Sequence, residues 1–299
     1  MNRIFFHKMD HDGKLAGAIA KKYFLEKGEQ FYLYPFNYDM SLPIEDFDKN
    51  DKLYFLDVVC QPYTEMQNLI NSGYNVIICD HHKSFLETEI HKQAKGNCSL
   101  DFAGCELTWK YFYPNTPMPE FVRLLGRYDM WDKFNEEWGT KILPFQWGMR
   151  NHRTDPINYF DIWEDLFNDN EDHHMSSILE EGKMILNYQR KVYAGQVATY
   201  SFEATLEDHP NLRLICLNSP GGNSMMFDER WNPDLYDAMF VFVSKGESYI
   251  CSLYTVKDLD LSVIAKSYGG GGHAQACGFT AKRVEVEKGV IKLIGTGKN

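Results

Sequence analysis

The sequence predicts an α/β protein made of a parallel-sheet domain with flanking helices, a helical linker and a smaller mixed α/β C-terminal domain. Three observations lead to this prediction. Short apolar runs alternate with helical patterns in the first half, which is typical of a parallel sheet covered by helices. A polar stretch at 150–176 is followed by a long helical pattern. Strand-like runs then surround a glycine-rich segment at 268–278, which indicates a mixed sheet.

The first domain opens with a strand, a loop and a helix. Residues 3–6 form a short apolar strand, and the run 15–25 places apolar side chains on one helical face. Further strand-like runs follow at 31–36, 53–58 and 76–79. Pro62 opens a helix between the last two runs, because proline is favoured in the first turn of a helix. Ligands of such sheets collect beyond the carboxyl ends of the strands, so functional residues are expected there.

The rest of the chain divides at a linker helix. The pattern is helical from 102 to 128, and another helical pattern runs from about 176 to 198. The final third contains strand-like runs at 212–217, 238–243 and 249–254. We therefore expect a first domain at 1–170, a linker at 171–198 and a second domain at 199–299.

The composition excludes several classes of protein. The 299 residues are 44% hydrophobic and 15% aromatic, which suits two packed cores and argues against disorder. The formal net charge is −11, so binding along duplex nucleic acid by phosphate neutralisation is not expected. The seven cysteines form no Cys-x-x-Cys pair, and no apolar run suits a signal peptide or a membrane span. We expect a cytoplasmic protein with reduced thiols and no membrane partner.

Acidic and histidine side chains stand at the predicted ends of three strands. The segment from His7 to Gly13 follows the first strand, Asp57 closes the run that starts at Leu53, and Asp80-His81-His82 follow the run that ends at Cys79. Another acid, Asp129, follows a predicted helix. Parallel strands end at one edge of a sheet, so these carboxylates would converge and repel one another unless cations neutralise them. A bridging carboxylate lets two divalent cations lie about 3.5–4 Å apart, the spacing used for phosphoryl displacement.

The types of side chain indicate which cation is suited. Carboxylate oxygens mixed with imidazole nitrogens favour a borderline ion such as Mn²⁺, with Mg²⁺ or Co²⁺ as alternatives. No cysteine belongs to the set, which argues against structural zinc. Each aspartate alone has a simpler interpretation as a helix cap or a turn residue, and only their joint placement favours a metal site.

The tripeptide Asp-His-His is not specific by itself, since the sequence repeats it at Asp172-His173-His174. That second copy follows no strand and is expected at the solvated start of a helix. Its context therefore favours Asp80-His81-His82 as the copy that binds metal.

In this order and spacing the motifs resemble those of the DHH phosphoesterase family, whose members include short-oligonucleotide ribonucleases and the RecJ exonuclease. The resemblance rests on Asp10-His11-Asp12-Gly13, Asp57, Asp80-His81-His82, Asp129 and the glycine-rich run from Gly269 to His273. It covers most of the chain, from residue 7 to 279. Two positions depart from the common pattern. Only Lys8 and Met9 separate His7 from Asp10, and Tyr254 stands after Ser-Leu where many members have arginine.

The resemblance implies two divalent cations, most simply Mn²⁺, with Asp57 bridging them. Their ligands would be His7, Asp10 and Asp57 for one, and Asp12, Asp57, His81 and Asp129 for the other. Asp57, Asp80 and His82 would form the catalytic set. Asp80 would support the cluster, and His82 would contact the scissile phosphate or the leaving oxygen.

The resemblance also implies that the C-terminal domain binds the end of the substrate. Gly270, Gly271 and Gly272 would bring backbone N–H groups close to a terminal phosphate, and His273 would add a donor. Tyr254 would stack on a base instead of pairing with a phosphate. The cleft between the domains would then be the active site.

The activity implied is two-metal in-line hydrolysis of phosphodiester bonds in short oligoribonucleotides or dinucleotides, which gives mononucleotides. The partner would be a small nucleotide or a short single-stranded oligonucleotide. Alternatives within the class are a phosphatase acting on adenosine bisphosphate, a cyclic-dinucleotide phosphodiesterase, and a pyrophosphatase or polyphosphatase. A catalytically weak nucleotide-binding regulator is the alternative outside it.

Overall fold

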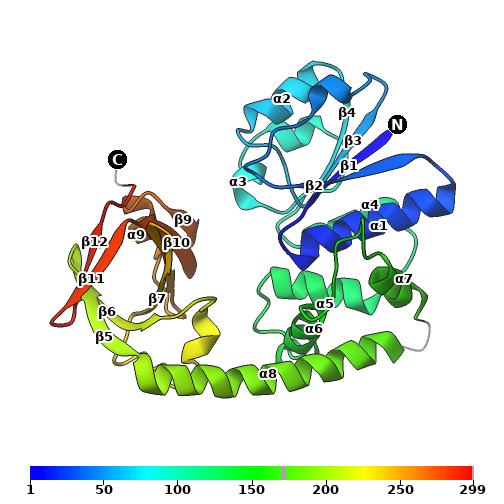
Figure 1. Cartoon of the computed structure of the whole chain (residues 1–299). Helices are drawn as coiled ribbons and strands as arrows, with labels where there is room; N and C mark the ends of the chain where they lie inside the picture. Colours follow the sequence, from blue (N-terminus) through cyan, green and yellow to red (C-terminus); the bar gives the residue numbers. More distant parts are fainter. Residues whose placement is uncertain (170–172, 298–299) are drawn as a thin grey trace. The chain divides into compact units, whose positions relative to one another are not determined.

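The computed structural model describes residues 1–169 and 173–297. The chain forms two compact units, Met1–Leu186 and Asn187–Asn299, and the division falls inside one long helix, α8 (His173–Tyr200) (Figure 1). This helix overlaps the stretch expected as a linker, 171–198. Its expected start at 171 and the expected end of the first domain at 170 lie outside the described residues.

The first unit contains the predicted parallel sheet, in the order β2-β1-β3-β4. The strands are β1 (Asn2–His7), β2 (Phe31–Phe36), β3 (Lys52–Leu56) and β4 (Asn75–Cys79). Phe6 lies opposite Leu56, and Leu56 lies opposite Cys79. The last residues of β3 and β4 are therefore level with one another and with the end of β1, which sets the position of everything that follows them.

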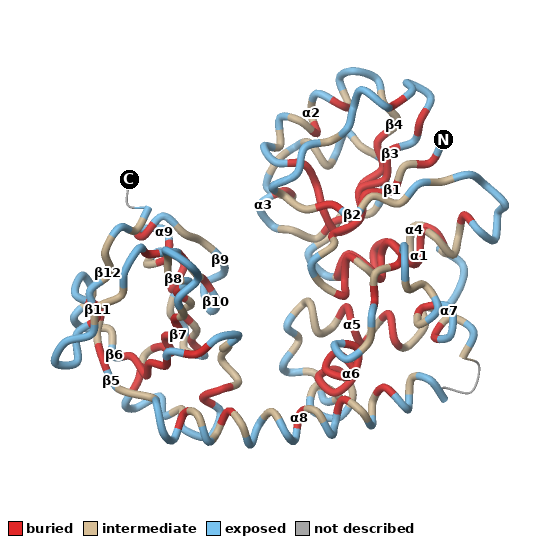
Figure 2. Tube along the Cα trace, in the orientation of Figure 1, coloured by how far each residue is buried: buried red, intermediate tan, exposed pale blue. Residues whose placement is uncertain are grey.

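Helices cover both faces of this sheet. Ile4 and Leu56 face α1 (His11–Lys27) and α4 (Gly104–Phe112), whereas Phe5 and Phe55 face α2 (Thr64–Asn71) and α3 (Lys83–Leu86). Alternate residues of one strand thus enter two different cores, as the period of a strand requires. Figure 2 shows the buried stretches running through β1, β3, β4 and α4.

The stretch predicted as helical from 102 to 128 is two helices, α4 and α5 (Glu120–Asp129). Pro114, Pro117 and Pro119 lie between them, and proline cannot continue a helix because it lacks an N–H donor. The remaining elements are α6 (Leu143–Met149), α7 (Asp161–Asn168), a π-helical turn at Trp138–Ile142 and 3₁₀ turns at Ile44–Asp46 and Ile90–Gln93.

The second unit is a mixed eight-stranded sheet in the order β11-β12-β5-β6-β7-β8-β10-β9. Its elements are β5 (Phe202–Leu206), β6 (His209–Asn218), a 3₁₀ turn at Ser224–Phe227, β7 (Ala238–Lys245), β8 (Ser248–Tyr254), α9 (Ser262–Ser267), β9 (Gly271–His273), β10 (Ala276–Ala281), β11 (Arg283–Glu287) and β12 (Val290–Ile294). The three expected strands are β6, β7 and β8. The glycine-rich segment contributes the edge strand β9.

Among the residues that the structure describes, no helix combines the length and the apolar character needed to cross a bilayer.

Candidate metal centre

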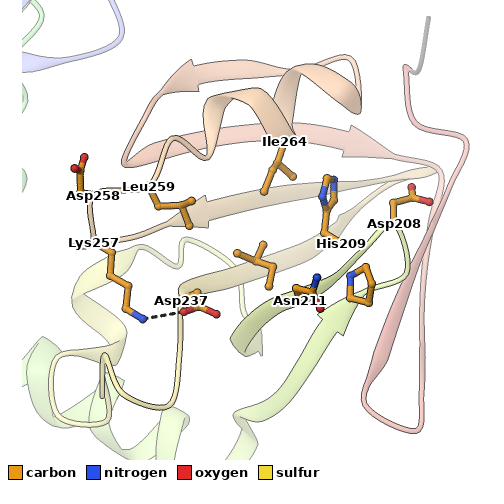
Figure 3. Close-up of a pocket in the computed structure, with 10 residues that line it drawn as sticks. Asp208, His209, Asn211, Asp237, Lys257, Asp258, Leu259 and Ile264 are labelled. Atoms are coloured by element: carbon orange, nitrogen blue, oxygen red, sulfur yellow. Dashed lines mark hydrogen bonds and ion pairs between the residues drawn. The ribbon is translucent and has the colours of Figure 1, made fainter.

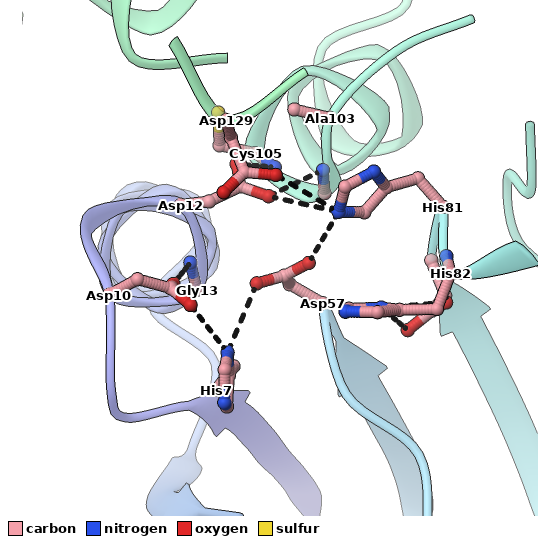
Figure 4. Close-up of polar contacts among 12 residues, drawn as sticks. His7, Asp10, Asp12, Gly13, Asp57, His81, His82, Ala103, Cys105 and Asp129 are labelled. Carbon is pink, nitrogen blue, oxygen red and sulfur yellow. Dashed lines mark hydrogen bonds and ion pairs between the residues drawn. The ribbon is translucent and has the colours of Figure 1, made fainter. Parts of the chain in front are cut away.

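Three strand ends place the predicted side chains at one edge of the parallel sheet. His7 ends β1, and Asp57 and Asp80 directly follow β3 and β4 (Figure 4). The backbone of Asp57 has φ +59°, a left-handed conformation that is costly for a residue other than glycine. Its N–H still donates to Cys79 O at 2.8 Å, so the strand pairing extends to the turn that presents the carboxylate.

The start of α1 supplies two further carboxylates. Asp10 caps this helix, because its Oδ1 accepts the N–H of Gly13 at 2.9 Å, and its Oδ2 lies 2.8 Å from His7 Nδ1. Asp12 is buried, and its two oxygens accept the N–H groups of Gly104 and Cys105, each at 2.8 Å. The carboxylate of Asp12 is therefore shared between the sheet edge and the start of α4.

Asp57 lies between the two histidines of the cluster. Its Oδ2 is 3.6 Å from His7 Nδ1, and its Oδ1 is 3.2 Å from His81 Nε2. His81 Nε2 in turn lies 3.2 Å from Asp129 Oδ2 and 3.7 Å from Asp12 Oδ2. The structure thus brings together all six residues that the sequence predicts as metal ligands.

The spacing of the ligand atoms suits metal ions. Within the described residues, ligand atoms lie within 4.8 Å of one another in three groups: His7, Asp10 and Asp57; Asp12, His81 and Asp129; and Asp57, His81 and His82. His7 Nδ1 and Asp57 Oδ1 are buried and make no hydrogen bond of acceptable geometry, although each lies near a partner. Buried polar atoms left in this way are costly unless something else binds them, so the site fits cations.

The electrostatics of the cluster also favour cations. Burial, followed by the charges of Asp57 and Asp129, raises the pKa of Asp12 well above its usual range. Burial and then the charge of Asp57 raise the pKa of Asp129 to about 7. These carboxylates repel one another in a medium where burial already opposes their ionisation, and divalent cations would relieve both effects.

The pKa values of His7 and His81 are also raised, which favours the charged form of each imidazole. Burial alone would lower the pKa of His7 and of His81, but neighbouring carboxylates outweigh it and raise the pKa to about 10 in both. Asp57 shows the counterpart: burial opposes its ionisation, and the contacts with His7 and His81 nevertheless lower its pKa. Protons would therefore compete with cations for these side chains.

Asp80 and His82 form a hydrogen-bonded pair beside these ligands. Asp80 is fully buried, and its Oδ1 accepts the backbone N–H of His82 at 2.8 Å and lies 3.3 Å from His82 Nδ1. Burial lowers the pKa of His82, but Asp80 outweighs this effect and the net pKa is raised. Asp80 thus fixes the ring of His82 and favours its protonated form.

The structure adds a residue that the sequence analysis missed. The hydroxyl of Tyr38 lies 3.0 Å from His82 Nε2, and its ring packs against His7 with 5.4 Å between the ring centroids. Burial and the charges of Asp80 and Asp57 raise the pKa of Tyr38, so the hydroxyl keeps its proton. Tyr38 also follows a strand of the parallel sheet, β2, and the rule that located the acids would have located it had tyrosine been considered.

Two glycines allow the elements to approach so closely. A Cβ at Gly104 would lie 2.4 Å from Asp57 Cβ, and a Cβ at Gly13 would lie 2.3 Å from His7 O. Real Cβ atoms do not approach other atoms to such distances, so only glycine fits at either position. No periodic pattern in the sequence marks them.

A buried histidine lies between the acids of the α1 segment. His11 sits between Asp10 and Asp12 in the sequence, and its pKa is lowered to about 4, first by burial and also by the positive charges of Lys14 and Arg150. His11 is therefore neutral, and cationic side chains lie close to the metal-binding segment.

The second unit places two of the predicted substrate residues, Tyr254 and His273, in one row across the sheet. Ala276 on β10 lies opposite Tyr254 on β8 and opposite His273 on β9. Residues paired in this way project from the same face of a sheet, and His273 and Ala276 are exposed there. Gly270 and Gly272 are required by close backbone contacts, whereas a Cβ at Gly271 would meet open space. The glycine run is thus an ordered edge strand.

An open cavity of about 550 Å³ lies elsewhere in the second unit and contains none of the predicted site residues (Figure 3). Leu212, Leu259 and Ile264 contribute its apolar side. Lys257 Nζ pairs with Asp237 Oδ1 at 2.8 Å on its polar side.

The second Asp-His-His copy differs from the first in its surroundings. His173 and His174 are exposed at the start of α8, and the N–H of His173 donates to Asp169 Oδ1 at 2.8 Å. Asp172 lies outside the described residues. The strand-end context separates the two copies, as expected from the sequence.

Comparisons with known proteins agree with this picture. No family profile matches the chain. It is 25% identical over 300 residues to an uncharacterized protein of Acanthamoeba polyphaga mimivirus, covering 92% of this chain and 66% of that protein. It is 23% identical over 315 residues to the oligoribonuclease NrnB of Bacillus subtilis (strain 168), covering 93% of this chain and 72% of that protein.

A solved structure shares the fold. It is described as the DHH domain of a member of a family of ribosomal proteins, and it matches 98% of this chain and 83% of its own with a TM-score of 0.57 and 13% sequence identity. The structural match shows the fold, and the sequence likeness to the Bacillus protein agrees with the resemblance of the ordered motifs to the DHH family.

Proposed function

We propose that this protein is a metal-dependent phosphoesterase that hydrolyses phosphodiester bonds of short oligoribonucleotides or dinucleotides. The observation that carries the proposal is the position of Asp57, whose two carboxylate oxygens lie near His7 on one side and His81 on the other. A buried carboxylate between two ligand groups is the arrangement that two-cation phosphoryl transfer requires. The name of the Bacillus relative, an oligoribonuclease, supports the choice of substrate.

Each ligand group would hold one divalent cation, with Asp57 shared between them. The first group is His7, Asp10 and Asp57, and the second is Asp12, Asp57, His81 and Asp129. When bound, such cations neutralise charge on the phosphoryl oxygens and make water a better nucleophile at neutral pH. The mixture of imidazole and carboxylate favours Mn²⁺, with Mg²⁺ and Co²⁺ as alternatives.

The protein's own groups would act on the leaving side of the reaction. In hydrolysis a water oxygen attacks phosphorus, the ester P–O bond breaks, and the departing oxygen takes up a proton. His82 is held by Asp80 and contacts Tyr38, and its pKa is raised, so it can donate a proton or a hydrogen bond to that oxygen. Asp80 and Tyr38 would act through His82 by fixing its ring.

The test is a panel of substrates assayed with defined divalent cations. Purified protein is incubated with Mn²⁺, Mg²⁺ or Co²⁺ and with oligoribonucleotides of two to ten residues, cyclic dinucleotides, adenosine bisphosphate and pyrophosphate. We expect hydrolysis of the shortest oligoribonucleotides to mononucleotides with the highest kcat/KM, and loss of activity in excess chelator. Full activity in chelator would contradict the proposal, as would pyrophosphate being the best substrate. Binding without turnover of any compound would favour a regulator.

The second unit would bind the end of the substrate. We expect His273→Ala to lower kcat/KM for dinucleotides by about 5- to 150-fold, which corresponds to about 1–3 kcal/mol for a lost charge-assisted contact. Mn²⁺ affinity should be unchanged, because His273 belongs to the other compact unit. The measurement is kcat/KM against oligomer length for both proteins. A wild-type value that rises steadily beyond ten nucleotides, with no effect of the substitution, would contradict this assignment.

A further inference from the structure

An aromatic cluster flanks a proposed metal ligand, Asp129, in the sequence. Asp129 is the last residue of α5, and Tyr128, Trp131 and Trp138 form a group of mutually contacting rings. The rings of Tyr128 and Trp138 are parallel within 6°, with centroids 5.8 Å apart, and both pack against the hydrophobic core. The ring of Trp131 stands nearly perpendicular to Trp138, at 80° and 5.3 Å. Trp131 is thus supported by two anchored rings.

Trp131 occupies a backbone position that favours glycine. The N–H of Trp131 donates to Tyr128 O at 2.9 Å, and the N–H of Asp132 donates to Arg127 O at 3.1 Å. These two bonds form the Schellman turn that ends α5, in which the residue at position 131 must be left-handed. Trp131 has φ +54°. A large side chain therefore stands where folding alone favours glycine.

The same side chain is exposed and lies beside a positive charge. Trp131 is 42% exposed, so part of its ring faces solvent. Lys133 Nζ lies 4.5 Å from the centroid of its ring. Arg150 Nη2 lies 3.2 Å from the hydroxyl of Tyr128, and the charge of Arg150 also acts on His11 in the metal-binding segment. Aromatic surface and cations are thus combined beside the ligand Asp129.

We propose that Trp131, supported by Tyr128 and Trp138, is a stacking surface for a nucleobase of the substrate, with Lys133 and Arg150 placed to attract its phosphates. This inference rests on the phosphoesterase function proposed above and names the chemical feature that the catalytic unit would recognise. Bases stack on exposed aromatic rings in a way that tolerates any sequence, and cations beside the ring pair with the backbone. It implies that the first unit itself selects nucleotides over phosphoesters without a base.

The test compares substrates with and without a base. The dinucleotide pApA and its analogues with one abasic ribose are given, with Mn²⁺, to wild type and to Trp131→Ala, Trp131→Phe and Trp131→Gly. Trp131→Gly places the residue that the turn favours, so it keeps the fold while removing the ring. We expect the Ala and Gly variants to lose about 5- to 150-fold in kcat/KM for pApA, the range for one stacked base. Trp131→Phe should retain most of the activity.

The abasic analogues separate stacking from a structural role. For the analogue that lacks the stacked base, wild type and Trp131→Gly should have equal kcat/KM, because there is nothing left to stack. Phe134→Ala, which removes a fully exposed ring three residues further on, is the matched control and should leave kcat/KM for pApA within about twofold. Equal losses on base-bearing and abasic substrates would overturn the proposal, and so would equal losses from Phe134→Ala and Trp131→Ala.

Binding distinguishes failure of this inference from failure of the proposed function. The affinity of a phosphorothioate analogue of pApA is measured by calorimetry for wild type and Trp131→Gly. Weaker binding by Trp131→Gly, without hydrolysis by wild type, would support the stacking surface and contradict the phosphoesterase. Hydrolysis by wild type, with binding and kcat/KM unchanged in Trp131→Gly, would overturn the stacking surface alone.

Discussion

Asp57→Asn should lower kcat by about 10³-fold or more while the protein stays folded. The substitution keeps the shape of the side chain and removes its charge. Asp57 is 1% exposed and lies between His7 and His81, so one lost charge would weaken the binding of both cations. The measurement combines kcat for a dinucleotide at saturating Mn²⁺ with calorimetric Mn²⁺ titration and circular dichroism.

Asp51→Asn provides the matched control. Asp51 is also buried in the first unit, at 3% exposed. Its Oδ2 lies 2.5 Å from Arg3 Nε, and Asp51 is not one of the proposed metal ligands. Its loss should lower the melting temperature, since the half-buried guanidinium of Arg3 would lose its charged partner, and leave kcat per folded molecule nearly unchanged. If Asp57→Asn lowered the melting temperature as Asp51→Asn does and kept its kcat, Asp57 would be a structural acid and the site would lie elsewhere.

His81→Ala and His173→Ala should differ by at least about 100-fold in their effect on turnover. His81 Nε2 lies 3.2 Å from both Asp57 Oδ1 and Asp129 Oδ2, so its loss would remove a proposed metal ligand at the point where the two groups meet. His173 is exposed on the first turn of α8, where substitution should change kcat less than about twofold. Both variants are assayed with the same dinucleotide and the same Mn²⁺ titration.

The outcome of this pair bears on where the chemistry takes place. A weaker Mn²⁺ affinity in His81→Ala, together with the loss of turnover, would identify the imidazole as a ligand. Comparable losses in the two variants would mean that strand-end placement does not distinguish the two Asp-His-His copies.

The sequence predicted the parallel sheet and its acidic edge because both follow from simple periodicities. Apolar runs of strand length located β1, β3 and β4, and polar side chains after such runs must lie where parallel strands end. Asp129 could be predicted only from the motif order of the DHH family. No period relates the end of α5 to the edge of the sheet.

Other features depend on tertiary contacts that local patterns do not encode. The strands β5, β11 and β12 are short and carry polar or charged side chains on their exposed face, so their apolar signal is weak. Gly104 resembles any glycine until Asp57 is seen 2.4 Å from its absent Cβ. Trp131 resembles a core residue until its left-handed backbone and its exposure are known.

The carboxylate of Asp12 would couple the proposed ion to folding as well as to catalysis. Its two oxygens hold the first N–H groups of α4 and also face His81 in the metal site. Without a cation, burial and its acidic neighbours favour protonation of Asp12, and a protonated carboxyl accepts those N–H bonds less well. Ion binding at the proposed site and the docking of α4 would therefore be reciprocal, and each would stabilise the other. At a free ion concentration 100 times the dissociation constant, mass action alone adds about 2.7 kcal/mol to the free energy of unfolding. The concentration of divalent ions around the protein would then determine how long it stays folded as well as how fast it catalyses.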